Sequence, residues 1–203
     1  HHVKIIMHDW FIRITGFPSF SGQSTKTSSF SQVISHEQVN FPVSDLTSYQ
    51  ELIEQQGIKS QTNVISLDKI IVDTNLSEKT GFSRSQQVWR LIRQRVVDGC
   101  ASVVDIDYLD ARLMPQLNRG IAENSIYDYL ENQLHLSISH AFKEITIDNT
   151  TEQDKILIDI GKDHHVVCIR SKVYLNNGNQ FQFTESRHKL EKFKFVDYAK
   201  RHH

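Results

Sequence analysis

Cysteine is scarce in this sequence. The two cysteines among 203 residues, Cys100 and Cys168, are too few for a disulfide framework, and they do not stand at a metal-ligand spacing. We therefore expect a protein of a reducing cytoplasm that holds no metal and no cofactor. The pairs His1-His2 and His202-His203 resemble remnants of expression tags, so they are left out of any argument about metal binding.

An excess of charge of one sign is also missing. Lys and Arg number 23 against 24 Asp and Glu, which gives a formal net charge of -1. A surface that neutralises a run of nucleic-acid phosphates needs a basic excess, so this stretch of chain is not expected to bind DNA by itself. A signal-peptide pattern and apolar runs of membrane-spanning length are absent as well, which predicts a soluble protein without membrane contact.

Short strands separated by turns dominate the sequence after residue 40. Alternating side chains predict strands at residues 62–72, 88–97, 101–108, 142–147, 165–175, 180–188 and 193–198. Capping residues followed by apolar residues at helical spacing predict helices at 46–57, 76–80, from 114 onward, 124–134 and 150–158. Because strands outnumber helices and meet through short turns, we expect an α/β fold with a mostly antiparallel sheet flanked by helices.

Two arginines, Arg93 and Arg95, stand two residues apart on the strand expected at 88–97. Side chains two residues apart on a strand point to the same face, so both guanidinium groups lie on one side of the sheet. Such a pair suits a divalent anion. The following strand carries Asp105 and Asp107 at the same spacing.

The turn between these two strands decides whether the arginines and the acids share a face. A two-residue loop at Asp98-Gly99 would separate them, whereas a three-residue loop at 97–99, with Gly99 as a left-handed bulge, would bring them together. We favour the bulged loop, because it also gathers the apolar side chains of both strands on the other face. The polar face then forms a pocket wall, and the alternative is a set of ion pairs on a solvated sheet.

Two expected helix starts add further phosphate-binding groups. Ser48 precedes the first helix, with exposed amides around Tyr49, and Ser125 and Tyr127 stand at the start of the helix at 124–134. Hydroxyl groups and backbone amides at helix starts bind phosphate. A serine at this position is more often only a helix cap, and a tyrosine more often part of the core edge, so the hypothesis depends on whether these groups meet in space.

Four runs of the sequence resemble one family: residues 41–52, 124–131, 143–145 and 181–197. They are similar to the effector-binding (UTRA) domains of GntR-family transcriptional repressors of the HutC branch, and within that branch to the repressors of trehalose operons. The similarity runs from about residue 39 to residue 201. It implies a chorismate-lyase-like α/β fold, a homodimer, and a phosphorylated sugar, trehalose 6-phosphate, as the effector that releases operator DNA.

The resemblance also implies roles for single residues. In related domains a serine at a helix start, an Arg-x-Arg strand and a Ser-x-Tyr helix start hold the phosphate, and an acid after the hairpin contacts the sugar. The matching phosphate-binding positions are Ser48 with the amide of Tyr49, Arg93, Arg95, Ser125 and Tyr127, and the matching acid is Asp105. His188 stands where relatives place a tyrosine over the sugar, and a disaccharide would need further partners such as Glu185 or Arg187.

Residues 1–38 differ from the rest in being rich in small polar residues, although residues 10–14 could form a strand. We interpret 1–38 as a tag, a linker or the remnant of a DNA-binding wing, and 39–201 as the UTRA domain. Because no winged helix-turn-helix domain fits into residues 1–38, we expect this stretch of chain to sense the effector without binding operator DNA.

An enzyme that converts a sugar phosphate is the rival class, because the implied fold is shared with a lyase. The histidines at 164, 165 and 188 could act as bases, and Asp105, Asp107 and Glu185 supply carboxylates. No nucleophile elbow, metal triad or phosphate-loop motif accompanies these residues. We therefore expect no catalytic residues.

Overall fold

The computed structural model describes residues 38–41 and 46–196, and its main feature is a six-stranded antiparallel sheet in the order β2-β3-β4-β7-β6-β5. Strands β1 and β8 form a separate, small parallel pair. This arrangement confirms the expected α/β fold with a mostly antiparallel sheet. The strands are β1 (Val39–Asn40), β2 (Ser60–Ile71), β3 (Gln87–Val97), β4 (Cys100–Asp110), β5 (Ile138–Asn149), β6 (His165–Leu175), β7 (Gln180–His188) and β8 (Phe193–Lys194).

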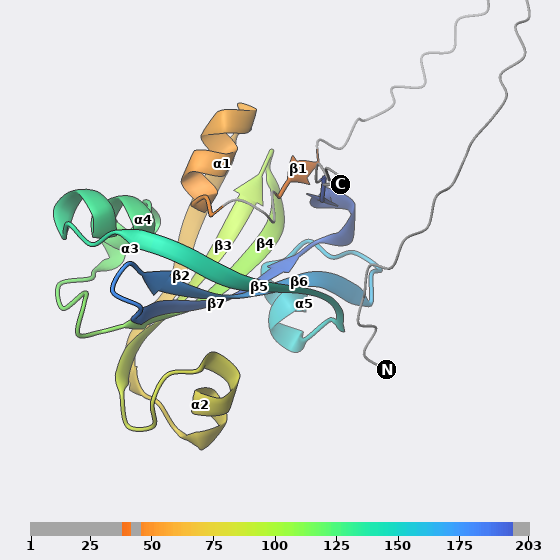
Figure 1. Cartoon of the computed structure of the whole chain (residues 1–203). Helices are drawn as coiled ribbons and strands as arrows, with labels where there is room; N and C mark the ends of the chain where they lie inside the picture. The colour runs from red at the N-terminus through yellow and green to blue at the C-terminus, as the bar shows by residue number, and fades with distance from the viewer. Residues whose placement is uncertain (1–37, 42–45, 197–203) are drawn as a thin grey trace, which may run out of the picture.

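Helices cover both faces of the sheet (Figure 1). We call the face that carries Arg93, Asp105 and Ser186 the front face, and the opposite one the back face. The front face is covered by α1 (Tyr49–Gln56), α3 (Arg119–Glu123), and α4 (Ile126–Asp128) with the π-helical turn Tyr129–Gln133 that continues it. The back face is covered by α2 (Thr74–Thr80) and α5 (Glu152–Leu157), and a 3-10 turn, Leu190–Lys192, precedes β8.

Two of the expected helix starts have the predicted geometry. Ser48 before α1 and Thr151 before α5 each form a capping box, in which the side chain and the amide of the cap pair with the third helical residue. The helix expected from residue 114 begins later, because Asn118 caps it: its Oδ1 accepts from the Ile121 amide at 3.1 Å. The possible strand at 10–14 and the end of the strand expected at 193–198 lie outside the described residues.

The turn between β3 and β4 differs from the favoured loop. Val97 pairs with Cys100, so Asp98 and Gly99 form a two-residue loop, and both have positive φ, at 49° and 79°. The shift of register lies inside the strands instead, since Arg95 pairs with Val103 and the next pair joins Val96 to Ala101. The bulge on β4 therefore falls at residue 102. It has the effect expected of a bulge at Gly99, because Arg93 stands opposite Asp105 on the front face.

Candidate functional site

A cavity lies on the front face between the sheet and the starts of α1 and α4. Side chains of five strands, β3, β4, β7, β6 and β5, form its floor. Its polar lining includes Ser48 and Tyr49 at the start of α1, Arg93 and Arg95 from β3, Asp105 and Asp107 from β4, Ser125 and Tyr127 at the start of α4, Lys143 from β5, Ser171 from β6, and Gln182, Thr184, Ser186 and His188 from β7.

The strand register explains why these residues meet. Arg93 stands opposite Asp105, and Asp105 stands opposite Ser186. One row further along the strands, Asp107, Thr184, Ser171 and Lys143 stand opposite one another in turn across β4, β7, β6 and β5. Because residues in one row point to the same face, the pairing of the strands aligns these polar groups across the floor of the cavity.

Both arginines form ion pairs at the β3 end of the cavity. Arg93 Nη2 lies 2.8 Å from Asp107 Oδ2, and Arg95 Nε lies 2.8 Å from Asp105 Oδ2. Their exposed fractions are only 6% and 4%, which excludes the alternative of solvated ion pairs on an open sheet. Arg95 also donates to Thr62 Oγ1 at 2.6 Å and lies 4.3 Å from the centre of the Tyr49 ring, so its fork is held in one position.

Charge and burial together fix the protonation states of the groups around the arginines. Burial raises the pKa of Asp105, but the charges of Arg95 and Arg93 and the hydrogen bonds from Ser186 and Arg95 outweigh it, so the net pKa is lowered and the carboxylate stays ionised. Burial raises the pKa of Tyr49 and of Tyr127. Both phenols therefore remain protonated near neutral pH and can donate hydrogen bonds.

The starts of α1 and α4 offer donors to the same space. Ser48 Oγ accepts from the Glu51 amide at 3.2 Å, and Glu51 Oε2 accepts from the Ser48 amide at 2.7 Å. The amides of Tyr49 and Gln50, in the first turn, have no acceptor within the helix. Ser125 Oγ accepts from the Asp128 amide at 3.2 Å. Both serine hydroxyls keep a proton to donate, so their capping roles are compatible with contact to an anion.

Several buried polar atoms of the cavity have no partner in the protein. Within the described residues, seven buried side-chain nitrogen or oxygen atoms lack a hydrogen bond. Four of the seven belong to cavity residues: Nε of Arg93, Oε1 of Gln182, and both ring nitrogens of His188. Burying such groups without partners costs free energy, and a bound molecule that supplies partners recovers it.

His188 lies at one end of the floor beside two aromatic rings. Its ring centroid is 4.4 Å from that of Phe41 and 5.3 Å from that of Phe193, and only 2% of the residue is exposed. Burial lowers the pKa of His188 to about 4, with a smaller opposing effect from Asp105. The imidazole is therefore neutral near pH 7, with one nitrogen that donates and one that accepts.

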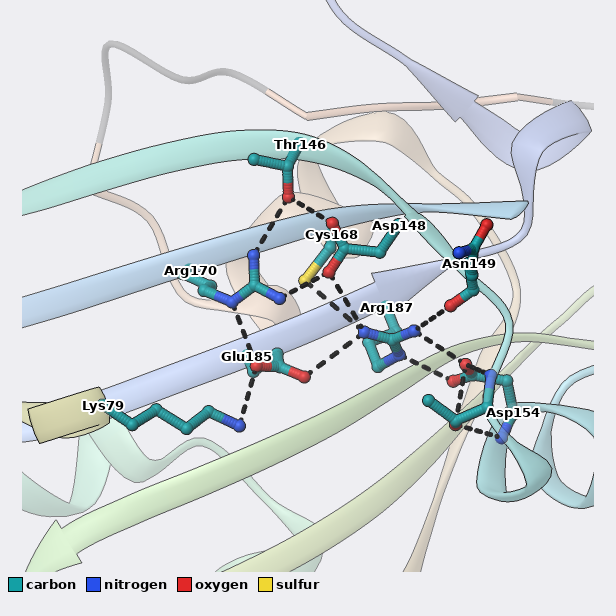
Figure 2. A network of polar contacts seen from close by, with 10 residues as sticks. Lys79, Thr146, Asp148, Asn149, Asp154, Cys168, Arg170, Glu185 and Arg187 are labelled. Carbon is teal, nitrogen blue, oxygen red and sulfur yellow. Dashed lines mark hydrogen bonds and ion pairs between the residues drawn. The ribbon is translucent and has the colours of Figure 1, made fainter. Parts of the chain in front are cut away.

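Glu185 and Arg187 do not line this cavity, contrary to the expectation that they contact the sugar. They alternate along β7 with Thr184, Ser186 and His188, so their side chains point to the back face. There they belong to the ionic network of Figure 2, in which Arg187 donates to both carboxylate oxygens of Asp154. Their face follows from the period of two along the strand, which places them opposite the cavity.

Sequence reasoning also missed residues that the cavity contains. Gln182, Thr184 and Ser186 share a face with His188 because they lie two, four and six residues before it, and that spacing could have identified them. Lys143 and Ser171 carry no such signal, because their positions depend on the pairing of β5 with β6 and of β6 with β7.

These features define a class of protein, one that binds a small ligand. A cavity lined by buried arginines and by unpartnered donors and acceptors is a site for a small ligand with polar groups. In the described part of the chain, His, Cys, Asp and Glu side chains form no group of three that could hold a metal ion. No helix described here is long and apolar enough to cross a membrane.

The chain belongs to the UTRA domain family, whose model matches residues 55–194. It is 39% identical over 171 residues to the HTH-type transcriptional regulator TreR of Bacillus subtilis (strain 168), which covers 84% of this chain and 72% of that protein. It is 24% identical over 156 residues to the HTH-type transcriptional repressor NagR of the same organism, over 77% of this chain and 64% of that protein.

Solved structures agree with this assignment. The effector binding domain of the B. subtilis trehalose repressor (TreR) superposes with a TM-score of 0.65 at 38% identity, over 70% of this chain and 99% of that one. PhnF from Mycobacterium smegmatis, at 18% identity, has a TM-score of 0.69 over 80% of this chain and 73% of that one, and it supports the fold alone. The chain therefore contains the effector-binding domain of a transcriptional repressor similar to TreR. The relatives are regulators of transcription and not enzymes.

Proposed function

We propose that the front-face cavity binds trehalose 6-phosphate and that this binding is the signal that releases operator DNA. The observation that carries the proposal is the set of buried atoms without partners on Arg93, Gln182 and His188. The arginine needs an acceptor, the glutamine oxygen needs a donor, and the histidine needs one of each. A sugar phosphate supplies all three, because phosphate oxygens accept and hydroxyl groups both donate and accept.

The phosphate fits the β3 end of the cavity. Arg93 and Arg95 supply charge, the start of α1 supplies Ser48 and the amide of Tyr49, and the start of α4 supplies the hydroxyl groups of Ser125 and Tyr127. Among the described lining residues, three basic side chains (Arg93, Arg95 and Lys143) outnumber two acidic ones (Asp105 and Asp107). The surplus of one positive charge favours an anionic ligand.

The sugar lies along the floor beyond the arginines in this proposal. Asp105 accepts from hydroxyl groups because its carboxylate is ionised, and neutral His188 offers a donor and an acceptor. The trehalose part of the proposal is supported by the similarity to TreR, whose solved domain is that of a trehalose repressor. Isothermal titration calorimetry with four ligands tests the proposal: trehalose 6-phosphate, trehalose, glucose 6-phosphate and inorganic phosphate. Tight binding of the first is expected, and its failure to bind would overturn the proposal.

Replacing the arginines tests where the phosphate binds. Arg93→Ala and Arg95→Ala each remove a charge-assisted contact, and we expect each to weaken trehalose 6-phosphate binding by about 1.5–3 kcal/mol. Arg90→Ala is the matched control, because Arg90 lies on the same strand but lines the groove of the back face. Unchanged affinity in both front-face variants would place the phosphate elsewhere.

In the intact regulator, we infer a homodimer in the cytoplasm whose effector domains are linked to DNA-binding domains. Trehalose 6-phosphate would favour one arrangement of the dimer in which those domains no longer match the operator half-sites. A coupling free energy of about 1–3 kcal/mol lowers operator affinity roughly five- to hundredfold. This stretch of chain alone should give no sequence-specific gel shift on operator DNA at physiological salt, and a discrete shifted band would contradict that expectation.

A further inference from the structure

The floor of the cavity continues past the groups assigned above to phosphate and sugar. From Arg93 on β3, the polar side chains cross β4 and β7 and reach Ser171 on β6 and Lys143 on β5. Four strand spacings separate β3 from β5, which amounts to roughly 19 Å at about 4.8 Å each. This floor is longer than one sugar ring and its phosphate require.

The far end offers hydrogen-bonding groups of the kind that bind a sugar ring. Ser171 and Lys143 are half-buried, stand opposite each other, and both line the cavity. A hydroxyl group donates and accepts, and an ammonium group donates up to three hydrogen bonds. Ile169 adds an apolar surface beside them, which suits the carbon face of a ring.

One buried group near this end, the side-chain oxygen of Gln182, has no hydrogen-bond donor among the described residues. Gln182 lies two residues from Thr184 on β7, and Thr184 stands directly opposite Ser171. Gln182 donates through Nε2 to Asp107 Oδ1 at 2.8 Å, but its Oε1 is buried and has no donor. The residue is 5% exposed, so only a molecule inside the cavity can supply that donor.

We propose that Ser171 and Lys143 form a subsite for a second sugar ring, with Gln182 between the two rings. This inference rests on the proposed function, because it takes the phosphate to lie at Arg93 and Arg95. The domain then selects its ligand by length, because one end of the cavity binds the phosphate and the other end binds the second sugar ring. A disaccharide phosphate reaches both ends, whereas a monosaccharide phosphate reaches only the first.

The test compares two ligands on variants of the far end. Ser171→Ala and Lys143→Met are titrated with trehalose 6-phosphate and with glucose 6-phosphate, the second up to millimolar concentrations by NMR so that weak binding is measured. Lys172→Met is the matched control, because Lys172 follows Ser171 directly on β6 and therefore points to the back face. Thermal unfolding of each variant establishes that it is folded before titration.

We expect both far-end variants to lose about tenfold or more in affinity for trehalose 6-phosphate and to keep the wild-type affinity for glucose 6-phosphate. Lys172→Met should leave both affinities unchanged. Equal losses for the two ligands, or no loss for either, would overturn the subsite while leaving the effector assignment intact. Failure of the wild-type domain to bind trehalose 6-phosphate would instead overturn the proposed function and the subsite with it.

Discussion

The two faces of strand β7 both carry buried polar side chains, but these differ in whether they have hydrogen-bond partners. On the back face, Glu185 and Arg187 are buried and bonded to several neighbours, as Figure 2 shows. On the front face, His188 is as deeply buried but has no hydrogen-bond partner within the described residues. Burial of polar groups therefore does not by itself mark a binding site. On β7, the distinguishing feature is whether the protein has already satisfied those groups.

The back-face network fastens elements together. Glu185 accepts from Lys79 of α2 at 2.9 Å and from Arg170 of β6 at 3.1 Å. Arg187 holds Asp154 of α5 through two hydrogen bonds of 2.8 Å and also donates to the Asn149 carbonyl oxygen. The network thus joins both back-face helices to the sheet, and we assign it to stability. The front face is the one expected to respond to a ligand.

The largest effect is expected from Arg187→Met, which removes the ion pairs of Arg187 from the back-face network. The change leaves Asp154 buried without its main counter-charge and removes one of the three cations that pair with Glu185, so it should lower the free energy of unfolding by about 3–5 kcal/mol. Urea denaturation measures the loss. Lys155→Met is the control, because Lys155 also pairs with a carboxylate, that of Glu152, but both side chains are exposed, at 52% and 85%, and the change should cost under about 1 kcal/mol. Similar costs for the two variants would contradict the assignment.

The second prediction concerns pH and the unsatisfied histidine. Burial holds the pKa of His188 at about 4, whereas an unfolded histidine titrates near 6.5, so between these values the unfolded chain binds more protons. Stability should therefore fall by roughly 3 kcal/mol as the pH drops from 7 to 4. Carboxylates with lowered pKa values, such as Asp105, lose their contribution only below about pH 4. His188→Phe should flatten the dependence between pH 7 and 4, and an unchanged slope in urea denaturation would refute the prediction.

The smallest effects come from two threonines, one on each face. Thr184 donates to Asp107 Oδ1 at 2.6 Å in the cavity, and Thr146 donates to Asp148 Oδ1 at 2.8 Å in the back-face network. Replacing either by valine should cost about 1 kcal/mol of stability. Only Thr184→Val should also weaken trehalose 6-phosphate binding in calorimetry. Equal effects of the two variants on binding would remove the distinction between the faces.

Local signals predicted much of the fold. The capping boxes at Ser48 and Thr151 mark helix starts within a few residues, and alternation marks the strands, so both could be recognised in the sequence. The turn at Asp98-Gly99 could not be assigned in the same way. The length of the loop and the bulge at residue 102 depend on how β3 and β4 pair. The predicted loop was one residue too long and its bulge was placed at Gly99, but the two errors cancelled, so the arginines and the acids were still assigned to one face.

Residues of the candidate site could be predicted where the local pattern of one strand or helix start determines their position. They could not be predicted where the position depends on the pairing of distant strands. Arg93, Arg95 and Asp105 follow from alternation along one hairpin, and the structure brings them together. Glu185 and Arg187 were chosen without regard to their face, and Lys143 enters the cavity only because β5 pairs at the far edge of the sheet.

Adjacent residues of β7 provide the most direct test of the central claim that the front face binds the effector and the back face stabilises the fold. Ser186→Ala removes a hydroxyl group that faces the cavity, and Glu185→Gln removes a charge from the network one residue away. Calorimetric titration of both variants with trehalose 6-phosphate should show weakened binding for Ser186→Ala and wild-type affinity for folded Glu185→Gln. The reverse pattern, or equal affinities, would contradict the account.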